Sequence, residues 1–273
     1  MSKLISLFNF LFLIILFFGC STTMPTTPLI DATHQKDIKT IELLLNKGAD
    51  INGIGGKNGE TPLMVASRRG NFDIVRLLID EGADVNARGA YGDTALLAAA
   101  WICQNEIGKY LIKNGAQVNA RNVNYGATVL NLAAGKCKNT NFIRLLLDNG
   151  ADIHIKNNGG DSPLFSAIKN RQPSIVNMLL DSGANINEKN GSFTALMIAV
   201  LRGNEDVVSI LINKKIDINA KNRFGDTALD IAKEHRKSNI VGLLKQAGAI
   251  EKPKKWFGLE PVWVPPLRPH KIK

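Results

Sequence analysis

Residues 59–66 read Gly-Glu-Thr-Pro-Leu-Met-Val-Ala, and residues 77–87 read Leu-Leu-Ile-Asp-Glu-Gly-Ala-Asp-Val-Asn-Ala. The first stretch places a helix-capping threonine before a proline, and proline is tolerated there because its missing backbone N–H would have no partner anyway. The second stretch ends an apolar stripe at Gly82, a residue type that readily takes the left-handed conformation that terminates a helix. Together they predict two short helices followed by an extended loop.

The same two signatures recur along the chain with a period of about 33 residues. The threonine or serine of the triplet is found at residues 27, 61, 94, 128, 162, 194 and 227, with spacings of 34, 33, 34, 34, 32 and 33. A Gly-Ala step follows 21 or 22 positions later in every unit except one, where Lys215 replaces the glycine. The period indicates one repeat array, whereas the length of 273 residues alone would suggest about two globular domains.

These residues closely resemble the ankyrin repeat, whose pattern runs from G-x-T-P-L-H-x-A-A to L-L-L-x-x-G-A-D-V-N-A, with Met64 in place of the usual histidine. The resemblance implies an all-α fold, a solenoid of about seven helix-turn-helix units with β-hairpin-like finger loops. We expect it to cover residues 27–250, with repeats starting near the seven residues given above and with the first and last units acting as caps. Ankyrin families characteristically bind other proteins through the concave face of the stack.

The N-terminal segment differs from everything that follows it. Residues 4–19 are apolar apart from Ser6 and Asn9, and 16 residues are fewer than the roughly 20 that span a bilayer. Gly19-Cys20 resembles the end of a bacterial lipoprotein signal peptide, although Phe17 and Phe18 depart from the usual pattern at the two preceding positions. The resemblance implies that residues 1–19 are removed and that Cys20 is lipidated; ordinary secretion and an uncleaved anchor are the alternatives.

This interpretation predicts an exported protein held at a membrane and facing the periplasm or the cell surface. Ser21 is not the aspartate that often retains such proteins in the inner membrane, so the resemblance favours the outer membrane if the cell has one. Residues 20–26 would form a lipidated tether, and the six residues after Cys20 span at most roughly 20 Å. The repeat stack is therefore expected to lie close to the membrane.

The net charge gives only a weak indication of the partner. The chain carries 34 Lys and Arg against 24 Asp and Glu, a formal charge of +10. The basic residues are spread over all the repeats and interleaved with acidic ones, which solvated helix faces explain better than nucleic-acid binding does. We expect no nucleic-acid partner; attraction to anionic lipid or cell-wall polymer is a lesser alternative.

Stacking leaves some positions of each unit free for recognition: the finger loop, the residue before each threonine, and the residues seven and eight places after it. Tyr, Trp and Arg often dominate interface energies, and Tyr91, Trp101 and Tyr125 occupy such positions on neighbouring repeats. The alternative is that these rings pack between the fingers. The residues predicted to contact a protein partner are Arg68, Arg69, Tyr91, Trp101, Ile102, Tyr125, Phe193, Leu201, Arg202, Arg223 and Phe224.

The sequence contains no recognisable catalytic or metal-binding motif. The four histidines lie in different repeats or in the tail, and none has a metal-ligand spacing. Nucleophile elbows, phosphate-binding loops and dinucleotide fingerprints are also absent from the sequence. We therefore predict a non-enzymatic protein that needs no cofactor.

Two of the three cysteines share a register. Cys103 and Cys137 each lie nine positions after the repeat threonine, in equivalent turns of adjacent units. Regularly stacked helices lie about 8–10 Å apart, farther than the about 4.4–6.8 Å between the Cα atoms of a disulfide. The unit that begins at Thr128 has one extra residue near residues 138–140, which would let its turn lean across. The sequence thus allows a Cys103–Cys137 disulfide in an oxidising compartment; two free, partly buried thiols are the alternative.

Residues 251–273 lack the repeat pattern and form a basic tail that contains proline and tryptophan. The tail either folds back over the last repeat or stays free. For the whole chain we predict a monomeric, membrane-anchored binding module that contacts a protein partner through its concave face. The alternatives are an inhibitor or immunity-type protein for one enzyme, or a structural or stress-resistance protein of the envelope that contacts wall or lipid.

Overall fold

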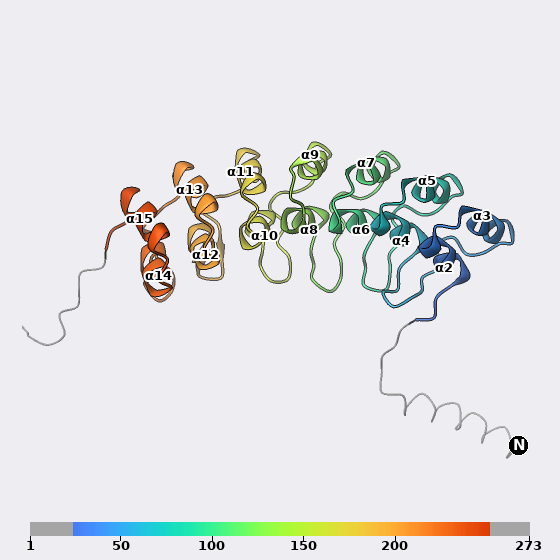
Figure 1. The fold of residues 1–273 in the computed structure, drawn as a ribbon, viewed down its shortest axis with the longest axis horizontal. Helices are drawn as coiled ribbons and strands as arrows, with labels where there is room; N and C mark the ends of the chain where they lie inside the picture. Colours follow the sequence, from blue (N-terminus) through green and yellow to red (C-terminus); the bar gives the residue numbers. More distant parts are fainter. Residues whose placement is uncertain (1–23, 252–273) are drawn as a thin grey trace, which may run out of the picture.

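The structure, a computed structural model, describes residues 24–251 (Figure 1). This part of the chain contains 14 helices, arranged as consecutive antiparallel pairs. Figure 1 shows the pairs side by side in sequence order as a shallow arch, with the first helix of each pair and the connecting loops on the inner side. The predicted all-α solenoid of about seven helix-turn-helix units is confirmed.

Each pair consists of two helices of two to three turns. The first helices are α2 (Pro28–Gln35), α4 (Pro62–Arg69), α6 (Ala95–Trp101), α8 (Val129–Lys136), α10 (Pro163–Lys169), α12 (Ala195–Arg202) and α14 (Ala228–Glu234). The second helices are α3 (Ile38–Asn46), α5 (Phe72–Asp80), α7 (Asn105–Lys113), α9 (Asn141–Asp148), α11 (Pro173–Asp181), α13 (Glu205–Asn213) and α15 (Ser238–Gln246).

The first helices begin where the capping residues predict. In each one, the threonine or serine side chain accepts a hydrogen bond from the backbone N–H three residues later. This bond satisfies one of the N–H groups that have no partner within the helix. The threonine period of the sequence therefore sets the spacing of the units along the arch.

The core is a continuous row of side chains between neighbouring units. The alanine five positions after each capping residue is buried in every unit, with at most 4% of its surface exposed. A methyl group at this position lets the first helices of adjacent units approach closely. The alanines are Ala32, Ala66, Ala99, Ala133, Ala167, Ala199 and Ala232.

The finger loops, which join the second helix of one pair to the first helix of the next, contain little regular β-structure. In one finger β1 (Lys189–Asn190) pairs antiparallel with β2 (Phe193–Thr194), with Lys189 opposite Thr194. Two other fingers each form a single bridge, between Gly55 and Glu60 and between Arg121 and Thr128. Within residues 24–251, the finger that contains β1 and β2 therefore has the most regular hairpin pairing.

Asparagine side chains connect successive fingers. Asn86 Oδ1 accepts a hydrogen bond from the backbone N–H of Gln117 at 2.8 Å, and Asn86 Nδ2 donates to the Gly115 carbonyl at 2.9 Å. Asn119 and Asn219 form the same pair of bonds with the units that follow them. In the described part of the chain, His154 and Asn187 stand at this position without making these bonds. The two junctions that follow these residues are therefore less well connected.

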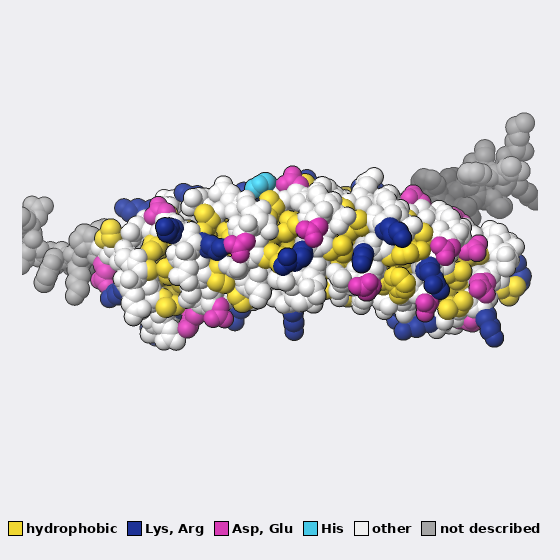
Figure 2. Space-filling model, turned by 90° about the horizontal axis from the view of Figure 1, so that it is seen from above, with side chains coloured by type: hydrophobic (Ala, Val, Ile, Leu, Met, Phe, Trp, Pro, Cys, Tyr) yellow, Lys and Arg dark blue, Asp and Glu magenta, His cyan; other side chains and the backbone are white. Residues whose placement is uncertain are grey.

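The outer face, over the second helices, has no region of a single charge sign. Figure 2 shows this face with basic and acidic side chains interspersed among hydrophobic ones. Such a distribution is typical of solvated helix surfaces and offers no extended basic patch for a nucleic-acid backbone.

Several predictions concern the ends of the chain. Cys20, the predicted signal peptide and most of the tail (252–273) lie outside the described residues. Between residues 24 and 251, no helix combines the length and the hydrophobicity needed to cross a membrane.

Candidate binding site

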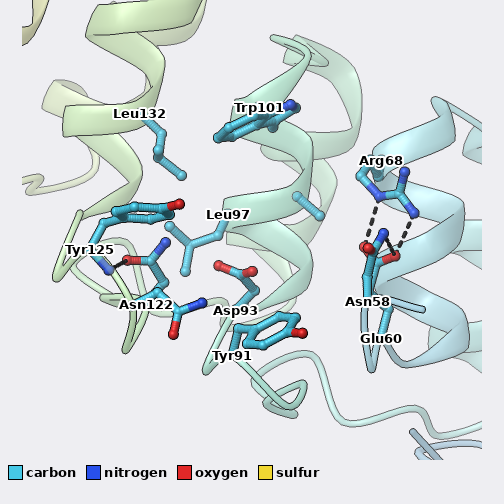
Figure 3. Close-up of a pocket in the computed structure, with 12 residues that line it drawn as sticks. Asn58, Glu60, Arg68, Tyr91, Asp93, Leu97, Trp101, Asn122, Tyr125 and Leu132 are labelled. Carbon is cyan, nitrogen blue, oxygen red and sulfur yellow. Dashed lines mark hydrogen bonds and ion pairs between the residues drawn. The ribbon is translucent and has the colours of Figure 1, made fainter. Parts of the chain in front are cut away.

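A pocket of about 390 Å³ opens on the inner face of the arch, where the units beginning at Thr61, Thr94 and Thr128 meet (Figure 3). Its lining comes from α4, α6, α8 and the fingers that precede them. Of the residues predicted to contact a partner, the pocket brings together Arg68, Tyr91, Trp101 and Tyr125.

Three aromatic side chains surround the pocket. Tyr91 and Tyr125 stand on successive fingers, and Trp101 is the last residue of α6. Their exposed fractions are 45%, 65% and 47%, so none is buried between the fingers. Figure 3 shows Leu97, from the preceding turn of α6, at the centre between these rings. The three rings therefore present an accessible aromatic surface that spans two units.

Trp101 is held by a neighbour outside the pocket. Lys136 Nζ, on the last residue of α8, lies 4.2 Å from the centre of the indole ring. The interaction of a cation with the face of a tryptophan ring contributes about 0.5–1 kcal/mol at exposed sites. The contact favours this orientation of the indole.

An ion pair closes one side of the pocket. Arg68 Nε donates to Glu60 Oε1 at 2.7 Å, and the second guanidinium nitrogen pairs with Glu60 Oε2. Asn58 Nδ2 also donates to Glu60 Oε2, at 3.1 Å. The hydrogen bond to Glu60 raises the pKa of the Arg68 guanidinium, in spite of partial burial. The charges of Glu60 and Arg68 therefore neutralise each other.

Asp93 lies in the middle of the pocket with its carboxylate between Tyr91 and Leu97 (Figure 3). Burial raises the pKa of Asp93, and the negative charge of Glu60 raises it further. A hydrogen bond from the Asn122 side chain partly opposes this shift by favouring the charged carboxylate. Asp93 is thus a partly desolvated acid at the centre of an aromatic surface.

The other predicted contact residues lie elsewhere. Arg69 Nε donates to His34 Nδ1 at 2.9 Å, and Ile102 is 38% exposed but does not line the pocket. A second set lies farther along the stack: Phe193 belongs to β2, Leu201 packs against the core, the Arg202 carbonyl accepts from Arg171, and the Arg223 guanidinium lies 4.7 Å from the centre of the Phe224 ring. Four of the predicted contact residues therefore share one pocket, and the others are scattered over the stack.

The comparisons with known proteins agree with this architecture. The family model described as "Ankyrin repeats (3 copies)" matches residues 8–89, 29–122, 121–190 and 187–254. The chain belongs to the ankyrin-repeat family. Ankyrin repeats serve as a protein–protein interaction module, and this chain has that fold.

Two solved ankyrin-repeat structures are similar to the chain. The ankyrin repeat domain of Bcl-3, described as a unique member of the IkappaB protein family, is 30% identical with a TM-score of 0.66, over 80% of this chain and 98% of that one. The human ASB11 ankyrin repeat domain is 24% identical with a TM-score of 0.72, over 83% of this chain and 100% of that one. The second likeness shows the fold alone. No curated protein matches the sequence.

Several residues that line the pocket of this ankyrin-repeat protein are not among those predicted to contact a partner. Leu97 and Leu132 lie three and four positions after a capping threonine, outside the positions that stacking leaves free for recognition. Glu60 and Asp93 directly precede a capping threonine, a position that the sequence leaves free for recognition, but they are not among the residues predicted to contact a partner. The sequence does indicate that Asp93 differs from Glu60 and Asp161, because Trp101 stands where their units have Arg68 and Lys169.

Cys103 and Cys137 are joined by a disulfide in the structure, with their Cα atoms 5.5 Å apart. Their turns are not equivalent, contrary to the expectation from their shared register. Cys103 has a φ of 59°, in the left-handed region, whereas Cys137 is extended with φ −71° and ψ 145°. The extra residue of the unit that begins at Thr128 accompanies this extended path, and the two cysteines approach more closely than regularly packed helices would.

The pocket does not contain a metal site. Across residues 24–251, the acidic, histidine and cysteine side chains nowhere gather in groups of three or more that could hold a metal ion. The polar groups of the pocket are instead two carboxylates, a guanidinium, amides and phenols. This chemistry suits recognition of a polar or charged group on a partner.

Proposed function

We propose that this chain is a membrane-anchored, non-enzymatic ankyrin-repeat protein that binds a protein partner through the inner face of its stack. The observation that carries the proposal is the exposure of Tyr91, Trp101 and Tyr125 around one pocket on that face. Exposed aromatic clusters mark interaction surfaces, and Trp and Tyr are enriched among residues that dominate binding energy.

The membrane anchor is the second part of the proposal. It rests on the resemblance of residues 1–20 to a lipoprotein signal, with Cys20 as the lipidated residue. Lipid anchoring would place the pocket, in the second to fourth units, near the membrane surface because the tether is short. The partner would then be another envelope protein or one that approaches the same surface.

An affinity-capture experiment tests the binding function. The chain without its signal, as bait against solubilised envelope proteins, should retain a defined partner. The pair Tyr91→Ala and Trp101→Ala should reduce capture at least tenfold, because each ring removed from a hot spot costs about 2 kcal/mol or more. The matched control is Lys113→Ala with Arg144→Ala, two exposed residues on the outer helices α7 and α9. Equal capture by both double variants would contradict the proposal.

A separate experiment tests the anchor. The full chain expressed in a bacterium should incorporate labelled palmitate and fractionate with membranes. Cys20→Ser should abolish both, whereas Cys103→Ser with Cys137→Ser should leave both unchanged. Palmitate incorporation that survives Cys20→Ser would rule out this lipidation site.

A further inference from the structure

An acid–base pair recurs at a fixed place in the ankyrin units of this chain. The acid directly precedes the capping residue, and the base lies seven positions after that residue. Glu60 pairs with Arg68 in the unit beginning at Thr61, and Asp161 pairs with Lys169 in the unit beginning at Ser162. The pair joins the end of a finger to the end of the first helix that follows it.

The unit that begins at Thr94 keeps the acid of this pair and lacks the base. Asp93 occupies the acidic position, and Trp101 occupies the position of the base. Throughout the described chain, no Lys or Arg forms an ion pair with Asp93, and its polar partner is the neutral amide of Asn122. The carboxylate of Asp93 therefore lacks the cation that Glu60 and Asp161 have in their units.

The surroundings of Asp93 are suited to a cation from outside. Glu60 and Arg68 neutralise each other, so the ionised Asp93 gives the pocket lining a net negative charge. Figure 3 shows the carboxylate between Tyr91 and Leu97, with the Tyr125 ring to one side; Trp101 lies beyond Leu97 and already has Lys136 over its ring. Aromatic faces attract cations, and a carboxylate strengthens its attraction to a cation as water is excluded. An anionic guest would meet an uncompensated negative charge.

We propose that this pocket binds an arginine side chain of a protein partner, with its guanidinium paired to Asp93 and stacked on a tyrosine ring, Tyr91 or Tyr125, beside that carboxylate. Arginine fits better than lysine because its planar group pairs with a carboxylate through two hydrogen bonds and stacks on rings at the same time. The guest supplies the base that Arg68 and Lys169 supply within their own units. The inference rests on the proposed function and specifies the chemistry of the partner.

The direct test uses three capped pentapeptides, Gly-Ser-X-Ser-Gly, in which X is arginine, lysine or citrulline. Citrulline has the shape of arginine without its charge. Binding to the chain without its signal is followed by NMR through the Leu97 methyl groups, which lie at the centre of the pocket. The arginine peptide should give saturable shifts with a Kd of roughly 1–10 mM. The lysine peptide should bind about threefold more weakly than the arginine peptide, and the citrulline peptide should bind at least tenfold more weakly. Absence of saturable shifts up to roughly 50 mM arginine peptide, or equal binding of citrulline or lysine, overturns the assignment.

Matched variants separate a binding role from a structural one. Asp93→Asn should weaken the arginine peptide at least tenfold, whereas Asp161→Asn, at the same position of another unit, should leave it unchanged. Trp101→Arg recreates the internal pair and should abolish peptide binding without lowering the thermal unfolding temperature. Unchanged peptide binding by Asp93→Asn, or retained binding by Trp101→Arg, overturns the inference.

The same variants distinguish this inference from the proposed function. If the partner is lost with Tyr91→Ala and Trp101→Ala but retained by Asp93→Asn, the inner face binds the partner without an arginine at this pocket. In that case the inference fails and the proposed function stands. If capture is unaffected by all of these variants, the proposed function fails as well.

Discussion

Lys215 takes a left-handed backbone conformation, with a φ of 60°, at a position where the other units have glycine. A side chain in this conformation places Cβ against the following carbonyl oxygen, at a cost of roughly 1–2 kcal/mol. The fold imposes the conformation because the chain must turn from α13 into the next finger at this point. Lysine is accommodated because its side chain is exposed to solvent.

Lys215→Gly should therefore increase the free energy of unfolding by about 1 kcal/mol, measured by urea titration. The matched control is Lys214→Gly, one residue earlier, where φ is −81° and glycine offers no relief. A similar gain in both variants would show that the effect does not come from the backbone conformation.

Protonation of Asp93 makes the free energy of unfolding depend on pH. Because burial raises its pKa, the folded protein binds this proton more tightly than the unfolded chain does. Charging Asp93 therefore costs stability as the pH rises from the unfolded pKa through the folded one. The facing groups act in both directions: Glu60 repels the charge, the Asn122 amide favours it, and Arg68 is engaged by Glu60.

Asp93→Asn should raise the Tm at pH 7 by about 1–2 °C and give no gain near pH 3, where both states are protonated. Thermal unfolding across this range measures the difference. A gain that grows as the pH falls would contradict the sign of the shift. A gain in stability on removing Asp93 is what the proposed binding role predicts, because functional residues are often retained at a cost in stability.

At the scale of elements, Gly108 sets the distance between α7 and α9. It is buried, and a Cβ atom added to it would overlap Cε2 of the buried Phe142 ring. In an exposed helix, alanine in place of glycine gains about 1 kcal/mol. Here we expect Gly108→Ala to lose about 1–3 kcal/mol, because overpacking outweighs helix propensity.

Chemical unfolding of Gly108→Ala measures this loss, and the matched control is Gly242→Ala in α15. A Cβ atom at Gly242 has no neighbour within 4 Å, so this variant should show the ordinary gain in helix propensity. A gain at Gly108 as well would mean that α7 and α9 are not in close contact.

The disulfide is a cross-link between two elements, the turns after α6 and α8. We expect titration of the unreduced chain to find neither Cys103 nor Cys137 reactive. Cys103→Ser with Cys137→Ser should lose about 2–4 kcal/mol, because the bond closes a loop of 34 residues. Two reactive thiols in the protein prepared without reductant would contradict the pairing.

The helices were predictable from the sequence because each is marked by local chemistry that repeats. A capping threonine such as Thr61 begins a first helix, and a glycine such as Gly82 ends a second one. The conformation of Cys137 was not predictable in this way. One inserted residue is compatible with several backbone paths through the turn, and the local sequence does not distinguish between them. The role of Asp93 also required the structure, since it depends on rings from two fingers and on the absence of a base across the helix.

At the scale of the whole molecule, each unit contacts only its neighbours, so local defects weaken particular junctions. His154→Asn should restore the inter-finger bonds that Asn86 and Asn119 make, and each such bond contributes about 0.5–1.5 kcal/mol. Amide hydrogen exchange should slow in the units that begin at Ser162 and Thr194. His154→Ala is the control, because it removes the imidazole without supplying the amide. Equal slowing in both variants would exclude restored hydrogen bonds as the cause.

The position of the disulfide has a consequence for how the protein tolerates damage. The bond joins the two units that carry Trp101 and Tyr125, whereas the junctions after His154 and Asn187 lack the asparagine bonds. Proteolytic or thermal damage should therefore begin in the C-terminal half and stop before the cross-linked units. In a protein with this arrangement the distal repeats unfold first, and the units that carry the proposed binding pocket stay folded longest.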